Sequence, residues 1–203
     1  MSESMWQFED SYFEKGFKLV CGIDEAGRGP LAGPVCAAAV ILPPHVEIDG
    51  LNDSKKLSDK RRRELVPIIK ENAVAYGIAF ADEKEIDEIN ILQATFLAME
   101  RAVAQLPVKP EILLIDGNRE KDFGIPVETV VKGDSRSASI AAASVLAKVS
   151  RDDLLLEMAE NYPQYGFEIH KGYGTKAHYQ ALTEFGPCPI HRMSFLKKFY
   201  GTK

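Results

Sequence analysis

Short apolar runs alternate along the chain with longer stretches in which apolar residues recur every three or four positions. The run from Val35 to Leu42 is apolar at every position and ends at two prolines, which is typical of a buried strand. We expect it to be an interior strand that pairs with the preceding run. The predicted strands are Lys18–Ile23, Val35–Leu42, Ala73–Ala81, Glu111–Ile115 and Val127–Val131.

The longer stretches predict helices. From Ile91 to Leu106 the apolar residues step by four and three along one stripe, which indicates a helix packed on the core. A stretch from Ser135 toward Tyr162 is rich in Ala and Ser, and such small side chains allow a helix to lie close to a sheet. Other predicted elements are a helix from a Ser58 cap to about Asn72, an acidic helical turn at Asp82–Glu88, a loop at Pro163–Gly174 and a helix over Thr175–Phe185.

The length of 203 residues and the hydrophobic content of 45% predict one domain with short extensions. We place an N-terminal extension at 1–17, laid on the surface as a flap, the main domain with its C-terminal helices at 18–186, and a tail at 187–203. No apolar run approaches the ~20 residues of a membrane span, and the acidic N-terminus does not resemble a signal peptide. These features predict a cytoplasmic protein without a membrane partner, whose three cysteines are reduced and structural.

Carboxylates follow three of the predicted strands. Asp24 and Glu25 end the first apolar run, Asp116 follows the fourth and Asp134 the fifth. Because the ends of neighbouring strands lie side by side, these acids could converge on one patch. Each has an ordinary alternative, since an Asp after a strand is often a turn residue and Asp134 could cap the helix that follows it.

Clustered carboxylates repel one another, which raises their pKa values unless cations bind. A set of oxygen ligands without His or Cys suits the hard cations Mg²⁺ or Mn²⁺. Two such ions can activate a water and stabilise the leaving oxygen in phosphoryl transfer. The sequence therefore favours a two-metal site at these strand ends.

The net charge of −5 at first argues against a nucleic-acid partner. However, residues 1–131 hold 15 Lys and Arg against 23 Asp and Glu, whereas residues 132–203 hold 10 against 7. Divalent metal that neutralised four of the acids would leave a net charge of −1. Acidity is therefore weak evidence against contact with phosphate groups.

Three glycines follow Glu25 within eight residues, at positions 27, 29 and 33. They invite a dinucleotide-binding interpretation, but Gly-Arg-Gly-Pro-Leu-Ala-Gly does not have the spacing of the dinucleotide fingerprint, and adjacent carboxylates would repel a pyrophosphate. We rank that alternative low. A second alternative is a nucleic-acid-binding module with a structural acid cluster, which would bind hybrids without metal-dependent cutting.

Several motifs, in order, resemble those of bacterial ribonuclease HII, the type 2 ribonuclease H. They are Gly22–Pro34, Leu51–Leu57, Ile115–Asn118, Lys132–Ser135, Ala142–Lys148 and His170–Gly174, and the resemblance spans about residues 18 to 195. It implies an α/β, ribonuclease H-like fold with a mixed five-stranded sheet flanked by helices and a C-terminal helical segment. It also implies endonucleolytic hydrolysis of RNA in RNA–DNA hybrids. A further implication is cutting 5′ of ribonucleotides embedded in duplex DNA, with 3′-hydroxyl and 5′-phosphate ends, for ribonucleotide removal and RNA-primer clearance.

The resemblance also implies roles for single residues. Asp24, Glu25, Asp116 and Asp134 would be the metal-binding catalytic acids. Gly27, Arg28 and Gly29 would reach the junction, Tyr173 would lie against the ribose that bears the 2′-hydroxyl, and Asn52 and Lys55 would hold a DNA phosphate. One departure is Arg192-Met193, where two arginines are expected after His191, and it puts a two-arginine phosphate contact in doubt.

The related type HIII enzymes carry a sizeable N-terminal domain, for which the segment before the first strand is too short. The tail Met193–Tyr200 has the spacing of a sliding-clamp-binding peptide, with Leu196, Phe199 and Tyr200 in place and Met193 where glutamine belongs. The alternative, a tail folded back on the body, is the one we favour. We expect a monomer.

Overall fold

The computed structural model describes residues 5–52 and 54–201, except the side chain of Lys55. Within this part of the chain, five strands form one mixed sheet in the order β3-β2-β1-β4-β5. Strand β1 is antiparallel to β2 and parallel to β4, β2 is antiparallel to β3, and β4 is parallel to β5. The strands are β1 (Val20–Ala26), β2 (Val35–Ile41), β3 (Ala75–Ala81), β4 (Ile112–Asp116) and β5 (Val127–Val130).

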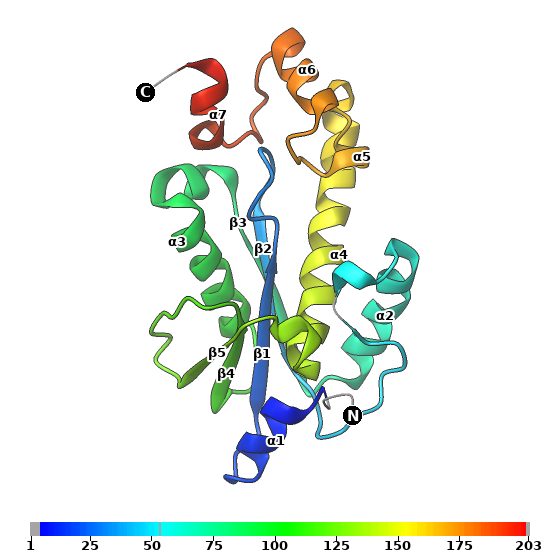
Figure 1. The fold of residues 1–203 in the computed structure, drawn as a ribbon, viewed down its shortest axis with the longest axis vertical. Helices are drawn as coiled ribbons and strands as arrows, with labels where there is room; N and C mark the ends of the chain where they lie inside the picture. The colour runs from blue at the N-terminus through cyan, green and yellow to red at the C-terminus, as the bar shows by residue number, and fades with distance from the viewer. Residues whose placement is uncertain (1–4, 53, 202–203) are drawn as a thin grey trace.

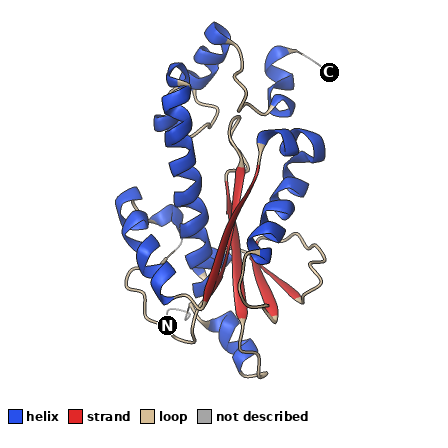
Figure 2. Cartoon of the chain, turned by 180° about the vertical axis from the view of Figure 1, so that it is seen from behind, coloured by secondary structure: helices blue, strands red, loops and turns tan. Residues whose placement is uncertain are grey.

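Helices cover both faces of the sheet (Figure 1). Helix α3 (Glu83–Ala104) packs on β2 and β3 on one side, and α4 (Ala138–Asn161) packs on β1 and β2 on the other, with α2 (Asp59–Asn72) against α4. Beyond one end of the sheet lie α6 (Lys176–Phe185) and α7 (Met193–Tyr200), as Figure 2 shows. Among the described residues, no helix combines the length and the apolarity needed to cross a membrane.

Small residues let α4 lie directly on the sheet, as their number in this stretch predicts. A Cβ atom at Gly22 of β1 would lie 2.2 Å from the backbone carbon of Ser139 in α4. No residue other than glycine fits there without moving the helix. The close contact fixes the start of α4 over the centre of the sheet.

The predicted acidic turn and the helix after it are the two parts of α3. They join at Asn90, whose positive φ of 67° breaks the helical path. The Asn90 side-chain oxygen accepts hydrogen bonds from the backbone N–H groups of Leu92 and Gln93, at 3.0 and 3.2 Å. Asn90 thus caps the second part of the helix.

The prediction of a surface flap at the N-terminus is wrong in one respect. Residues Gln7–Phe13 form helix α1, and the Glu9 side chain is buried. Its Oε1 accepts from the Ser137 hydroxyl at 2.7 Å and from the Ser139 N–H at 2.9 Å. The carboxylate therefore satisfies donors at the N-terminus of α4, more than 120 residues away in sequence, which no local pattern could reveal.

The tail is folded back on the body, as the favoured alternative predicts. The backbone N–H groups of Met193 and Ser194 donate to the Asp87 carboxylate of α3, at 2.8 and 2.9 Å, so an acid from another helix caps α7. Leu196 has an exposed fraction of 0% and packs in an apolar cluster with Leu31 and Leu155. The predicted loop at Pro163–Gly174 contains two short helical turns, η3 (Pro163–Tyr165) and α5 (Phe167–His170).

Candidate metal and active site

Two of the predicted acids lie side by side because of the sheet register. The parallel pairing of β1 and β4 joins Ile23 to Ile115, so Asp24 and Asp116 are the next residues of adjacent strands. On its other side, β1 continues against β2, with Asp24 opposite Ala38. The Asp116 side chain accepts the Gly133 N–H at 2.6 Å, which ties the end of β4 to the turn that follows β5.

That turn brings in the third acid. Asp134 lies in the 3₁₀ turn η2 (Gly133–Ser135), and Ser137, rather than Asp134, caps α4 by accepting from the Ile140 N–H. The capping alternative for Asp134 is therefore wrong. One carboxylate oxygen from each of Asp24, Asp116 and Asp134 lies within 4.8 Å of the others.

Glu25 lies beside this set of three rather than within it. Its Oε1 is 3.3 Å from Arg28 Nη1. Glu25 also lines two cavities, one that Asp24 lines and a second that Asp116 lines. The charge of Glu25 contributes to the electrostatics of Asp24. The predicted convergence is thus observed for three acids, with the fourth at their margin.

The electrostatics of Asp24 fit a cation site. Burial, followed by the charges of Glu25 and Asp116, raises the pKa of Asp24 well above its ordinary value. A cation between these oxygens would offset both the repulsion and the cost of burial. Carboxylate oxygens are the ligands that Mg²⁺ and Mn²⁺ take in proteins, so the residues present fit a divalent metal.

A cavity of about 140 Å³ opens beside Asp24 and contains cationic groups that the sequence analysis missed. Ser144, Lys148 and Arg151 line it from α4 at spacings of four and three, which is one face of a helix. Arg62 of α2 lines it too and donates to the carbonyls of Ser54 and Leu57, both at 2.7 Å. The helical spacing of the three α4 residues could have predicted from the sequence that they share one face. Nothing in the sequence indicates that Arg62 of α2 lies beside them.

Two buried arginines, Arg151 and Arg192, donate hydrogen bonds to backbone carbonyls of residues 27–34, here called the glycine loop. Arg192 donates to the carbonyls of Gly27, Arg28 and Gly33 at 2.6, 3.0 and 2.8 Å. Arg151 donates to the carbonyls of Pro34, Ala32 and Lys171 at 3.0, 3.2 and 3.1 Å.

Burial lowers the pKa of both guanidinium groups, that of Arg192 to about 9. Arg192 has an exposed fraction of 0%, so its guanidinium points into the protein and cannot contact a substrate phosphate. The loop itself leads into β2 and not into a helix, so the dinucleotide-binding alternative is wrong.

The structure places Tyr173 next to the glycine loop. Its side chain has an exposed fraction of 46% and lines the cavity that contains Asp24 and Glu25. A Cβ atom at Gly29 would lie 3.5 Å from Tyr173 Cε1. Two of the predicted junction contacts are thus neighbours, at the edge of the acid cluster.

The remaining predicted residues lie in the loop before α2. Asn52 is exposed, and Lys55 belongs to the 3₁₀ turn η1 (Ser54–Lys56), but its side chain lies outside the described part of the structure. Asn52 does not line the acid cavity. Between them Ser54 is buried, and its hydroxyl lies 2.6 Å from that of Ser144, which in turn bonds Asp24. This loop is therefore connected to the site through serines that the sequence analysis missed.

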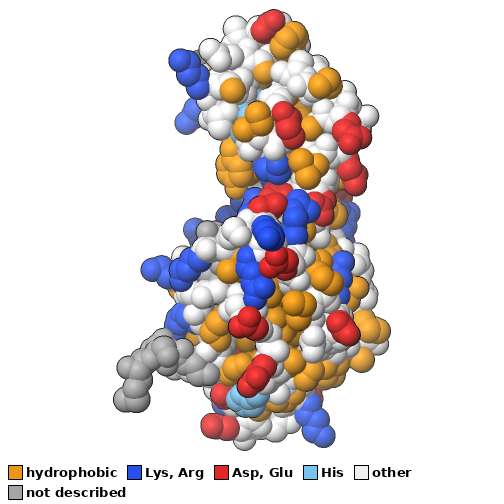
Figure 3. All heavy atoms as spheres, turned by 90° about the vertical axis from the view of Figure 1, so that its right-hand side faces the viewer, with side chains coloured by type: hydrophobic (Ala, Val, Ile, Leu, Met, Phe, Trp, Pro, Cys, Tyr) orange, Lys and Arg blue, Asp and Glu red, His pale blue; other side chains and the backbone are white. Residues whose placement is uncertain are grey.

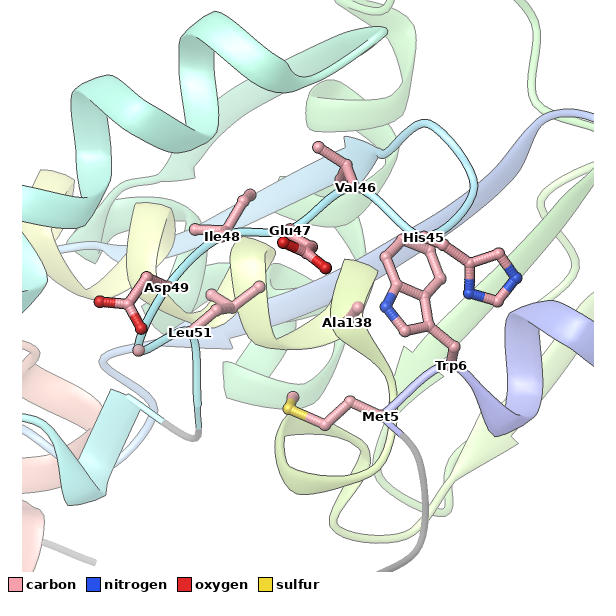
Figure 4. Close-up of a pocket in the computed structure, with 10 residues that line it drawn as sticks. Met5, Trp6, His45, Val46, Glu47, Ile48, Asp49, Leu51 and Ala138 are labelled. Atoms are coloured by element: carbon pink, nitrogen blue, oxygen red, sulfur yellow. The ribbon is translucent and has the colours of Figure 1, made fainter.

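A separate hollow of about 670 Å³ lies between the N-terminal residues and the loop that follows β2. Figure 4 shows Met5, Trp6 and Ala138 on one side of it and the segment from His45 to Leu51 on the other. None of the four predicted acids lines it. Asp24 and Glu25 line the smaller cavity instead.

The face formed by α2 and α4 presents a band of Lys and Arg side chains with acids among them (Figure 3). On the same two helices, Arg63 pairs with Asp59 and Asp153 at 2.8 and 2.6 Å, and Lys148 pairs with Asp152 at 2.8 Å. Such a band can contact phosphates despite the negative net charge.

A family model and individual relatives both match this chain to ribonuclease HII. Residues 21–198 match the model of the ribonuclease HII family. Ribonuclease HII of Dechloromonas aromatica is 62% identical over 177 residues, 87% of this chain and 90% of that protein. Ribonuclease HII of Endomicrobium trichonymphae is 57% identical over 196 residues, 96% of this chain and 93% of that protein.

Two solved structures support the fold. Ribonuclease H2 from Pyrococcus horikoshii gives a TM-score of 0.71 at 26% identity and covers 86% of this chain and 92% of that one. Ribonuclease HII in its complex with PCNA from Archaeoglobus fulgidus gives 0.72 at 26% identity and covers 86% and 94%. Together with the mixed five-stranded sheet, they confirm the predicted ribonuclease H-like α/β fold.

Proposed function

This chain belongs to the ribonuclease HII family of metal-dependent endonucleases that degrade RNA in RNA–DNA hybrids, and from that premise we propose that it also cuts 5′ of single ribonucleotides embedded in duplex DNA. The cut would leave a 3′-hydroxyl and a 5′-phosphate. The observation that carries the proposal is the position of Tyr173 and Gly29, which lie together at the margin of the acid cluster. Substrate recognition and bond cleavage would then occur within one small region.

The four acids have distinct places in this proposal. Asp24, Asp116 and Asp134 would hold the divalent metal, Mg²⁺ or Mn²⁺, and Glu25 would complete the set from the margin. When bound, two such ions supply an activated water and charge stabilisation for the leaving oxygen. The protein's own part is to hold the oxygens ready: the Gly133 N–H fixes Asp116 and the Glu25 N–H fixes Asp24, at 2.6 and 2.7 Å.

Discrimination of RNA from DNA at one nucleotide depends on the 2′-hydroxyl, which both donates and accepts. The Arg28 guanidinium only donates, whereas backbone groups beside Gly27 and Gly29 can do either and can approach closely. Arg192 and Arg151 donate hydrogen bonds to backbone carbonyls of this loop, and these bonds hold the loop in its conformation. Tyr173 would supply a flat surface for the sugar that follows the junction.

A duplex that contains one ribonucleotide tests the proposal. Incubation with Mg²⁺ should give a single cut on the 5′ side of the ribonucleotide, with a 3′-hydroxyl that a polymerase can extend. The same reaction in EDTA should leave the duplex intact. Binding without cutting in Mg²⁺ and in Mn²⁺ would favour the nucleic-acid-binding alternative and overturn the proposal.

A sliding clamp is a second proposed partner, because one similar structure is a complex of ribonuclease HII with PCNA. The fold sets a condition on this partner. Leu196 of the proposed peptide is buried, whereas Phe199 and Tyr200 have exposed fractions of 38% and 41%. Engagement of all three by a clamp would therefore require α7 to leave the body, whereas engagement of the two aromatic residues alone would not.

A further inference from the structure

A buried pair of histidines lies behind the Tyr173 loop and takes no part in the site described above. His178 lies in the first turn of α6, and His191 forms a β-bridge with Ala32 of the glycine loop. Both side chains are buried, and their Nε2 atoms are 3.0 Å apart. Such a contact needs one nitrogen to donate and the other to accept, so the position of each proton matters.

The backbone sets the proton position on His191. The Cys188 N–H, which can only donate, points at His191 Nδ1 from 2.9 Å. Nδ1 also lies 3.1 Å from Cys188 Sγ and 3.3 Å from the Cys188 carbonyl oxygen, so the N–H group is the nearest of its three Cys188 partners. With Nδ1 as the acceptor of this shortest contact, the proton of the neutral ring is on Nε2. His191 Nε2–H then donates to His178 Nε2.

The same logic continues through His178. Its Nε2 accepts from His191, so its proton is on Nδ1, and Nδ1 lies 2.9 Å from the carbonyl oxygen of Tyr173. A carbonyl can only accept, so the proton on His178 Nδ1 satisfies the 2.9 Å contact with Tyr173, whereas the Cys188 carbonyl lies at a longer 3.3 Å from His191 Nδ1. The reverse arrangement would set His191 Nδ1–H against an N–H group and a bare His178 nitrogen against a carbonyl.

Both rings are neutral in this arrangement, and their surroundings agree. Burial lowers the pKa of His178 and of His191, the latter to about 4. A second proton on either ring would also break one contact of the series. The three hydrogen bonds therefore form a series with one donor-to-acceptor direction, from the Cys188 N–H through His191 and His178 to the Tyr173 carbonyl.

We propose that His178 and His191 are positioning residues that hold the Tyr173 carbonyl, and through it the Tyr173 ring, against the substrate junction. This inference rests on the proposed role of Tyr173. The ring is half exposed, so packing alone does not fix it. The backbone before it is also unusual, since Lys171 and Gly172 have positive φ values of 51° and 83°. An anchor on the next carbonyl selects this conformation of the loop.

The anchor also joins the two halves of the proposed recognition surface. The Leu31 N–H donates to the Gly172 carbonyl and the Arg192 N–H to the Leu31 carbonyl, at 2.8 and 2.9 Å. The segment that carries His191 therefore supports the glycine loop through its backbone and Tyr173 through the two rings. Movement of one part would be transmitted to the other.

Two substitutions at His178 separate the hydrogen bond from the packing. In His178→Asn the side-chain amide lies where Nδ1 was and can still donate to Tyr173, whereas in His178→Gln the amide lies where Nε2 was and contacts His191 alone. We expect His178→Gln to lower kcat on the single-ribonucleotide duplex at least about fivefold, with duplex affinity unchanged. His178→Asn should keep most of the wild-type kcat.

Equal losses in the two variants would show that the ring's packing matters and not its bond to Tyr173, and would overturn the proposal. Wild-type kcat in both would overturn it as well. Because either variant could fold poorly, ¹⁵N spectra of the wild-type histidines give a second test. At pH 7 we expect the Nδ1–H form for His178 and the Nε2–H form for His191; an Nε2–H or doubly protonated His178 would contradict the series.

The two proposals fail in different ways. If the wild-type protein did not cut the single-ribonucleotide duplex, the proposed function would be wrong, while the ¹⁵N spectra would still decide the direction of the histidine series. If the wild type cut the duplex and the spectra contradicted that direction, only the positioning proposal would be wrong.

Discussion

Asp24 and Asp116 are neighbours across two parallel strands, one residue beyond the pairing of Ile23 with Ile115. This register brings two carboxylates together in a partly buried place, where burial and nearby charge raise the pKa of Asp24. An arrangement with this cost is hard to explain by stability. It is readily explained by a cation that the oxygens hold, which is the basis of the predictions that follow.

The metal-free protein should become more stable when Asp24 is replaced by Asn. A carboxyl whose folded pKa is raised contributes its stability below its unfolded pKa, near 3.8, and loses it as the pH rises through the folded pKa. The loss therefore grows as the pH rises from about 3.8 toward 7. Each pKa unit removed by Asp24→Asn corresponds to ~1.4 kcal/mol, or roughly 3–6 °C in Tm for a chain of this size.

Thermal unfolding in EDTA at pH 7 and at pH 4 checks this prediction. The gain in Tm should shrink at the lower pH, and added Mg²⁺ or Mn²⁺ should raise the Tm of the wild type more than that of the variant. A variant less stable than the wild type at both pH values would mean that the Asp24 charge is structural.

Tyr173 should matter more for cutting than for folding. Its ring is half exposed, so Tyr173→Ala should change Tm little, but loss of its contacts with the junction should reduce cleavage of a single-ribonucleotide duplex by roughly 5- to 150-fold, or about 1–3 kcal/mol. Tyr173→Phe, which keeps the flat ring, separates stacking from hydrogen bonding. Unchanged cleavage by both variants would remove Tyr173 from the recognition surface.

Glu9 should stabilise the start of α4. Glu9→Ala leaves the Ser137 hydroxyl and the Ser139 N–H without their acceptor and should cost about 1–3 kcal/mol, seen as a lower Tm. Glu9→Gln is the matched control, because it keeps an oxygen acceptor and removes a carboxyl whose pKa burial raises. Equal Tm values for the two variants would show that the bonds to α4 contribute nothing.

The C-terminal helix should stabilise the body through Leu196. Deletion of residues 196–203 removes a fully buried leucine and should lower the Tm, and Leu196→Ala should account for most of the loss, at about 2–5 kcal/mol. Phe199→Ala, at a half-exposed position, is the control. Clamp affinity that is undetectable both before and after the deletion would end the partner proposal.

The sheet and the acids were predictable because their signals are local. Each strand is a short apolar run, and Asp24, Glu25 and Asp116 come directly after such runs in the sequence. The predicted end of the first strand at Ile23 is wrong, because β1 continues against β2 through Asp24 and Glu25 to Ala26; only its pairing with β4 ends at Ile23. Residue order also revealed the family. The glycine at position 22 gave no such signal, because its need for a bare α-carbon comes from a helix more than 110 residues later.

The missed parts all depend on contacts between distant segments. Arg192 seemed a candidate for phosphate contact, but it is buried beneath Gly27 and Gly33. Glu9 lay among other acids in a stretch interpreted as a flap. His178 and His191 have no spacing that marks them as a pair, since only the fold brings their rings within 3.0 Å.

Cleavage by Asp134→Asn tests the central claim most directly, namely that the acid cluster holds the cations that cutting requires. The substitution keeps the shape of the side chain, and Ser137 still caps α4, so the protein should stay folded. We predict that the variant binds the single-ribonucleotide duplex with wild-type affinity and does not cut it in Mg²⁺. Cutting at a near-wild-type rate by the folded variant would contradict the account.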